Sequence, residues 1–170
     1  MKISDLLTKA DGDYPSLEGV YGNEKDLALL KKAFSSCSSE TTAVLQYIFQ
    51  SYVCKDVEVC KILRKIAITE MHHHETFGEI ITKLGGIPYY TNGHGGNYTT
   101  QCVYEGKNVL EMLNQNIKDE QGAVDYYEGI KKLLSNQKLV DIVDRIILDE
   151  LVHIDAFNKL IEYITFYKDK

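Results

Sequence analysis

Apolar residues recur every three to four positions over most of the chain beyond residue 23, the spacing of one face of an amphipathic helix. A first such segment runs from Asn23, a residue suited to cap a helix, to about residue 53. A second follows a break at Lys55 and Asp56 and stops at Gly85 and Gly86. Two more extend from about 107 to 130 and from about 140 to 164. The pattern predicts four long helices.

The connections between these segments predict how the helices are arranged. Short turns join the first helix to the second and the third to the fourth, so each pair should be antiparallel. Residues 86–106 are rich in glycine and lack a helical period, and they are long enough to cross a bundle from end to end. We therefore expect an all-α fold, an antiparallel four-helix bundle with one long crossover. Residues 24–170 form this domain, and 1–23 form an irregular arm with no assigned chemistry.

Acidic and imidazole side chains interrupt the apolar faces in a repeated pattern. Each member of a first set recurs 80 residues later with the same internal steps: Glu40, Tyr47, Glu70 and His73, then Glu120, Tyr127, Glu150 and His153. Duplicated spacing of this kind indicates an internal structural repeat. A glutamate and a histidine three residues apart lie on the same face of a helix, so their ligand atoms can converge. The repeat predicts two halves of one site.

Four carboxylates in the core of a bundle need neutralising cations, because burying an unpaired ion costs several kcal/mol. The apolar faces carry no lysine or arginine for this purpose. Two divalent metal ions would balance four carboxylates, and the neutral imidazoles of His73 and His153 would complete the ligand set. Mixed carboxylate and imidazole ligands suit iron or manganese. The pattern therefore predicts a dinuclear metal site.

From Glu40 to His153 the sequence resembles the ferritin-like superfamily, and in size and helix layout it is most similar to the rubrerythrin and bacterioferritin branches. Its six-residue ligand set resembles that of bacterioferritins and manganese catalases. The resemblance implies that Glu40 and Glu120 are terminal ligands and that Glu70 and Glu150 bridge the metals. It also implies that His73 and His153 each bind one metal, and that the carboxylates accept hydrogen bonds from Tyr47 and Tyr127. An acid at Asp149 is expected to orient His73.

Two departures distinguish the chain from rubrerythrins. Ala123 stands where those proteins carry a further glutamate, and the C-x-x-C motif of their electron-transfer domain does not occur in this sequence. Some alternatives stay open: His74 as the ligand in place of His73, and Met71 as a haem ligand, although haem is not the favoured cofactor. His72 and His94 are expected to be solvated polar residues.

The resemblance implies a non-haem di-iron oxidoreductase that uses O2 or hydrogen peroxide and is re-reduced by an external electron donor or by fresh Fe2+. A manganese catalase with two manganese ions is one alternative, and an iron-binding or storage subunit is another. A dimer would favour the enzyme and a hollow cage would favour storage. We expect a homodimer.

Composition limits the partners and the compartment. The net charge of −6 disfavours binding to nucleic acid or to an anionic membrane surface. No segment is long and apolar enough for a signal peptide or a membrane span. The four cysteines form no C-x-x-C pair and are expected to be buried thiols in a reducing compartment: Cys37, Cys54, Cys60 and Cys102. These features predict a cytoplasmic protein.

Overall fold

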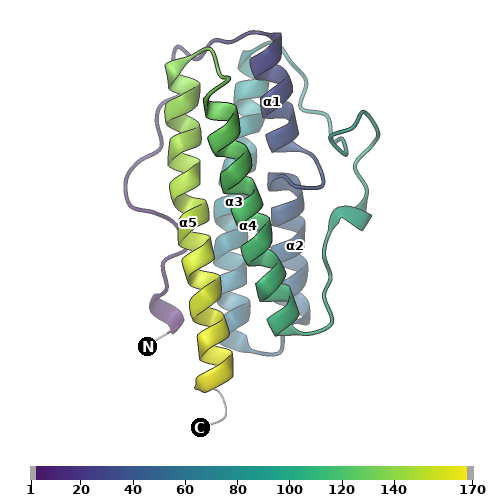
Figure 1. Cartoon of the computed structure of the whole chain (residues 1–170), viewed down its shortest axis with the longest axis vertical. Helices are drawn as coiled ribbons and strands as arrows, with labels where there is room; N and C mark the ends of the chain where they lie inside the picture. The colour runs from purple at the N-terminus through teal and green to yellow at the C-terminus, as the bar shows by residue number, and fades with distance from the viewer. Residues whose placement is uncertain (1–2, 168–170) are drawn as a thin grey trace.

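The computed structural model describes residues 3–167, in which five α-helices run along the long axis of the molecule (Figure 1). They are α1 (Glu24–Phe34), α2 (Glu40–Val53), α3 (Val57–Lys83), α4 (Val109–Lys131) and α5 (Gln137–Phe166), with short 3-10 helices η1 (Ile3–Asp5) and η2 (Thr100–Cys102). Helix α3 packs on α2 and α1, and α5 packs on α4. Helices α1 and α2 follow one another along one side of the bundle and together take the place of one long helix. The predicted four-helix bundle is therefore confirmed.

Side-chain caps define the helix ends. The Asn23 side chain accepts hydrogen bonds from two backbone amides of α1, and the Asp26 carboxylate accepts one from the backbone amide of Asn23, which completes a capping box. At the end of α3, the Gly85 amide donates to the Thr82 carbonyl and the Gly86 amide to the Ile81 carbonyl. This arrangement requires a positive φ at Gly85, where φ is 79°. Both boundaries agree with the sequence prediction.

The prediction of one continuous helix from 23 to 53 is wrong, because the chain leaves helical geometry between Phe34 and Glu40. This break is rich in serine, and short hydroxyl side chains compete with the helix for backbone partners. The Ser39 hydroxyl donates to the carbonyl of Ser36, and that of Thr41 to the carbonyl of Phe34. The break gives α2 its own N-terminus, at Glu40.

The crossover runs from α3 to α4 along the outside of the bundle, past α2 (Figure 1). A disulfide between Cys37 and Cys102 ties it to the break before α2. The prediction of four buried thiols is therefore wrong for this pair, and Cys37 does not lie in a helix. Cys54 and Cys60 are free thiols, as expected, but both are half-buried. Helical spacing alone did not distinguish a loop cysteine from a helix cysteine.

Two apolar clusters fill the bundle, one on each side of its polar centre. One contains Leu30, Phe77 and Leu139, and the other contains Tyr47, Leu63 and Phe157. Apolar packing on both sides fixes the spacing of the helices where the acidic residues face inward. Among the described residues, no helix is long and apolar enough to cross a membrane.

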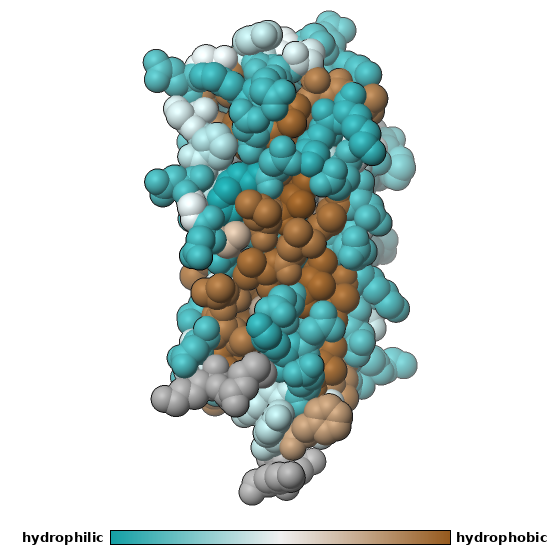
Figure 2. Space-filling view, turned by 60° about the vertical axis from the view of Figure 1, so that its left-hand side comes forward, coloured by the Kyte–Doolittle hydropathy of each residue, from teal (hydrophilic) through white to brown (hydrophobic). Residues whose placement is uncertain are grey.

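Some apolar side chains also remain on the surface. Figure 2 turns the side of the arm forward and shows apolar residues gathered on that face. Leu7, Leu148 and Leu151 are exposed and line a shallow hollow between the arm and α5. Large exposed apolar patches are typical of interaction surfaces. This face is compatible with the expected homodimer, which stays a prediction.

We expect Phe157→Ala to lower the free energy of unfolding by about 3–5 kcal/mol, because it removes a fully buried ring that packs on Tyr47. Phe166→Ala is the matched control, because Phe166 lies on the same helix but is 65% exposed. Its effect should stay within about 0.5 kcal/mol. Chemical denaturation of both variants measures the difference. Equal losses would show that the ring of Phe157 does not belong to the core.

Candidate metal centre

The structure brings the six sequence-predicted ligands together in the middle of the bundle. Their ligand atoms form two groups, and within each group all the atoms lie within 4.8 Å of one another. One group contains Glu40, Glu70, His73 and Glu150, and the other contains Glu70, Glu120, Glu150 and His153. Glu70 and Glu150 belong to both groups. This is the arrangement in which two carboxylates can bridge a pair of cations.

Each candidate ligand lies on a helix of the bundle, and the two apolar clusters pack the bundle on both sides of the site. Glu40 opens α2, Glu70 and His73 lie in the middle of α3, Glu120 lies on α4, and Glu150 and His153 lie on α5. All six side chains are buried, and both histidines have no exposed surface. Side chains on rigid helices hold ligand positions more tightly than side chains on loops.

Both imidazole rings turn Nδ1 toward the carboxylates. His73 Nδ1 lies 3.3 Å from Glu70 Oε2 and 3.3 Å from Glu150 Oε1. His153 Nδ1 lies 2.7 Å from Glu70 Oε1 and 3.1 Å from Glu150 Oε2. The two rings therefore present the same nitrogen to the centre.

The other nitrogen of each ring faces outward to an acceptor. His153 Nε2 lies 3.0 Å from the carbonyl oxygen of Thr8, which can only accept, so this nitrogen carries a proton. His73 Nε2 lies 3.1 Å from Asp149 Oδ2, which is the contact predicted for Asp149. With Nε2 protonated, a neutral ring offers its Nδ1 lone pair to a metal ion.

The N-terminal arm, to which no chemistry was assigned from the sequence, completes these outer contacts. The backbone amide of Ala10 donates to Asp149 at 2.7 Å, and the hydroxyl of Tyr14 also donates to this carboxylate. The guanidinium of Arg145 donates to Asp149 at 2.7 Å and to the Ala10 carbonyl at 2.8 Å. A backbone contact leaves no signature in the sequence. Arg145 could have been found from the sequence, because it is a charged residue in an apolar stretch, four positions before Asp149.

The arm also explains an asymmetry between the two halves of the repeat. Asp149 precedes Glu150, but the equivalent residue before Glu70 is Thr69. The Thr69 hydroxyl donates at 2.9 Å to the same Thr8 carbonyl that faces His153. In one half a carboxylate orients the histidine, whereas in the other a carbonyl of the arm does so and is itself held by Thr69.

Two buried tyrosines contact the terminal glutamates, as the resemblance implied. Tyr47 donates to Glu120 at 2.7 Å, and Tyr127 donates to Glu40. Each tyrosine follows a glutamate by seven residues but contacts the glutamate of the opposite half. The hydrogen bonds therefore connect α2 with α4 across the site.

The carboxylates repel one another strongly. Burial and the neighbouring Glu70 raise the pKa of Glu40 to about 7. Burial, together with Glu70 and Glu150, raises the pKa of Glu120 well above its usual value. Burial by itself would lower the pKa of His73 and His153, but the surrounding carboxylates outweigh it and raise both well above the ordinary value. All four shifts indicate an excess of buried negative charge.

One buried atom shows how a cation would fit. Among the described residues, Glu70 Oε1 has no hydrogen-bond partner. It lies 2.7 Å from His153 Nδ1, but that contact lacks the geometry of a hydrogen bond. A carboxylate oxygen beside an imidazole lone pair is favourable only when a proton or a cation interacts with both. The donor set therefore fits a pair of divalent metal ions.

The remaining candidates lie outside these groups. His74 stacks on Phe34 with the ring centroids 4.2 Å apart, so its imidazole packs against α1. His72 is exposed and contacts the edge of Tyr14, and His94 is exposed in the crossover. Met71 is 52% exposed on the outer face of α3. The choice of His73 over His74 agrees with this geometry.

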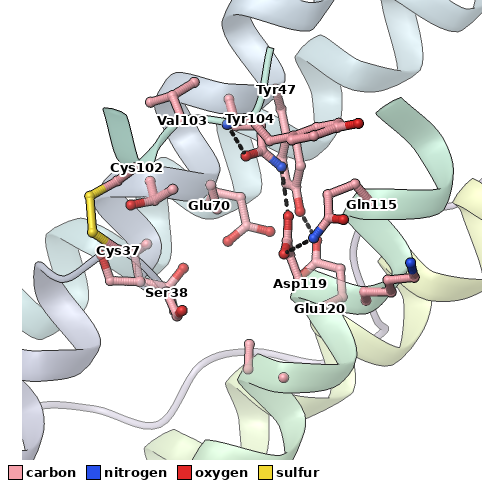
Figure 3. A pocket seen from close by; sticks show the side chains of 18 of the residues that line it. Cys37, Ser38, Tyr47, Glu70, Cys102, Val103, Tyr104, Gln115, Asp119 and Glu120 are labelled. Atoms are coloured by element: carbon pink, nitrogen blue, oxygen red, sulfur yellow. Dashed lines mark hydrogen bonds between the residues drawn. A yellow bond between two sulfur atoms is a disulfide. The ribbon is translucent and has the colours of Figure 1, made fainter. Parts of the chain in front are cut away.

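A cavity of about 800 Å3 reaches the site (Figure 3). Four ligand carboxylates line it, together with both tyrosines and the crossover residues 100–106. Next to it lie buried amides that the sequence analysis did not single out. Gln46 accepts from the Tyr104 backbone amide at 2.9 Å and donates to Asp119 and Asn116, while Gln50 and Asn116 exchange hydrogen bonds. This network fixes the crossover beside the site.

Comparison with known proteins agrees with the fold. The profile of the ferritin-like domain matches residues 35–166, most of the chain. A bacterioferritin of Desulfovibrio desulfuricans is 30% identical over 156 residues, 84% of this chain and 80% of its own. A protein of Clostridium acetobutylicum described as a probable manganese catalase is 22% identical over 163 residues, 84% of this chain and 72% of its own.

Solved structures show the same fold. A manganese catalase from Anabaena has a TM-score of 0.81 at 23% identity, covering 94% of this chain and 82% of its own. The Desulfovibrio desulfuricans bacterioferritin has a TM-score of 0.69 at 26% identity, and the match covers 85% of this chain and 82% of the bacterioferritin chain. The match over residues 35–166, with the bundle that encloses it, establishes that this chain belongs to the ferritin-like family.

Proposed function

We propose that this chain is a non-haem oxidoreductase that holds two metal ions and reduces hydrogen peroxide or O2. The observation that carries the proposal is the sharing of Glu70 and Glu150 between two four-residue ligand groups at the inner end of a cavity. Two metals held by common carboxylates supply two electrons together, as cleavage of a peroxide bond requires.

The protein side chains have separate roles in this proposal. Glu70, Glu150 and the Nδ1 atoms of His73 and His153 would hold the metals, with Glu40 and Glu120 as terminal ligands. Tyr47 and Tyr127 hold the terminal carboxylates in place through their hydroxyl groups. Apolar packing above and below the site excludes bulk water, so small oxidants would reach it through the cavity.

Iron is the metal we propose first. Carboxylates and imidazoles suit it, and the 30% identical relative is a bacterioferritin, a member of a branch that the sequence already resembles. In this case the protein would oxidise a ferrous pair and then need an external donor or fresh Fe2+. The likeness to a bacterioferritin is also compatible with storage of iron, which would require a hollow cage in solution.

Manganese catalase is the second candidate, and a specific observation favours it. The Anabaena manganese catalase matches 94% of the 170 residues, so the match must include part of the arm 1–23. The bacterioferritin match covers 85%. The arm contributes the Thr8 carbonyl and the Ala10 amide to the outer contacts of both histidines, so a shared arm would mean shared support of the metals.

The reaction itself distinguishes the two candidates. We expect anaerobic protein loaded with two Fe2+ per chain to consume one hydrogen peroxide for each ferrous pair, with a rise in ferric absorbance and without O2 release. Stopped-flow absorbance and an oxygen electrode measure both. Glu120→Ala is the control, because it removes a ligand from one group and should slow the oxidation. If the iron protein stays unreacted while manganese-loaded protein releases O2 from peroxide, the catalase assignment replaces the first.

A second prediction tests the outer contacts. Asp149→Asn should weaken metal binding roughly 10- to 100-fold, because the carboxylate that orients His73 is lost. Competition with a chelator measures the affinity, and thermal unfolding checks that the protein still folds. The matched control is Asp144→Asn, since Asp144 lies on the same helix and is exposed, paired with Lys131. Unchanged affinity in a folded Asp149→Asn protein would mean that Asp149 does not support the ligand.

A further inference from the structure

The cavity beside the metal centre is larger than hydrogen peroxide needs. Its volume is about 800 Å3, within the range of about 300–1,000 Å3 that is typical of sites for small organic ligands. A molecule of water occupies about 30 Å3 in the liquid, so peroxide, with two oxygen atoms, requires roughly 60 Å3. Access for peroxide alone does not explain the size of this space.

The lining of the cavity combines the predicted metal ligands with a mixed set of other side chains. Carboxylates line the end at the site, among them Glu70 and Glu120 (Figure 3). Ala43 on α2, Ala123 on α4 and Val103 of the crossover are apolar, whereas other lining residues are polar or charged. A ligand with a polar reactive end and a small organic body that makes both apolar and polar contacts matches this lining.

The wall that the crossover forms is held at two places. The disulfide between Cys37 and Cys102 fixes one end of it. At the other end, the Tyr104 amide donates to Gln46 at 2.9 Å, and the Tyr104 carbonyl accepts from Gln50 at 3.3 Å. Both amide side chains are buried. The cavity is therefore preformed, which lowers the ordering cost of binding a ligand in it.

Small residues on α4 keep the opposite wall open. Ala123 lines the cavity three positions after the ligand Glu120, on the same helical face. Its neighbour Gly122 also lines the cavity, and a Cβ atom added there would meet no atom within 4 Å. A longer side chain at Ala123 would occupy space that the structure leaves free.

From the size, the lining and the preformed wall, we infer that the site accepts organic hydroperoxides, with the organic group lying between Ala123 and the crossover wall. This inference rests on the proposed function and names a substrate class for it. The O–O bond breaks with uptake of two protons and two electrons, and it yields an alcohol and water. The electrons come from the reduced metal pair, each ion losing one. Ala123 and Val103 would then be specificity-determining residues.

The experiment uses cumene hydroperoxide and the variant Ala123→Leu, in protein loaded with Fe2+ under anaerobic conditions. Wild type should convert both cumene hydroperoxide and hydrogen peroxide. In Ala123→Leu, the ratio of the rate with cumene hydroperoxide to the rate with hydrogen peroxide should fall about tenfold or more, because the larger substrate needs the filled space. Gln121→Leu is the control, since Gln121 is exposed on α4 and is absent from the cavity lining.

A binding measurement gives a readout that does not depend on turnover. The alcohol product, 2-phenyl-2-propanol, should show saturable binding in saturation-transfer NMR to wild type and Gln121→Leu loaded with redox-inert Zn2+, and weaker binding to Ala123→Leu. Turnover of hydrogen peroxide without turnover of cumene hydroperoxide, and without binding of the alcohol, would overturn this inference and leave the proposed function intact. Failure of the loaded protein to convert either peroxide would overturn this inference together with the reduction of peroxide in the proposed function.

Discussion

Four glutamates that face one another inside an apolar bundle impose the constraint on which the rest of the structure depends. Burial and repulsion between carboxylates raise the pKa values of Glu40 and Glu120, whereas the pKa of Glu70 is lowered, because its contacts with His153 and His73 outweigh its burial. A core of this kind is stable only if positive charge is brought into it. The apolar clusters on both sides keep the carboxylates close together, so the packing that stabilises the fold also creates the demand for cations.

The surrounding polar contacts follow from the same constraint. Tyr47 and Tyr127 donate hydrogen bonds to the carboxylates of Glu120 and Glu40, and the Nε2 atoms of both histidines are turned outward. Segments outside the helices supply several of these contacts. In the arm, the Thr8 carbonyl faces His153, and the Ala10 amide donates to Asp149, which in turn faces His73. The crossover encloses the cavity on another side. The irregular parts of the chain therefore contribute to the site.

The sequence predicted the bundle and the meeting of the six candidate ligands at one place, because both depend on periodic spacing within helices. A glutamate and a histidine three positions apart, repeated after 80 residues, identify one helical face without knowledge of tertiary contacts. The sequence did not predict the break before α2, where serine hydroxyls take over backbone hydrogen bonds, or the pairing of Cys37 with Cys102. These features, like the Thr8 carbonyl, depend on which distant segments meet in space, and local periodicity carries no information about that.

Anomalous diffraction from crystals soaked with Fe2+ or Mn2+ tests the central claim most directly. The account predicts two peaks per chain about 3.5–4 Å apart, both within ligand distance of Glu70 and Glu150. One should also contact Glu40 and His73, and the other Glu120 and His153. In Glu40→Ala, we expect the peak beside His73 to weaken selectively, whereas Glu70→Ala should weaken both. A single peak, or two peaks that do not share Glu70 and Glu150, would contradict the account.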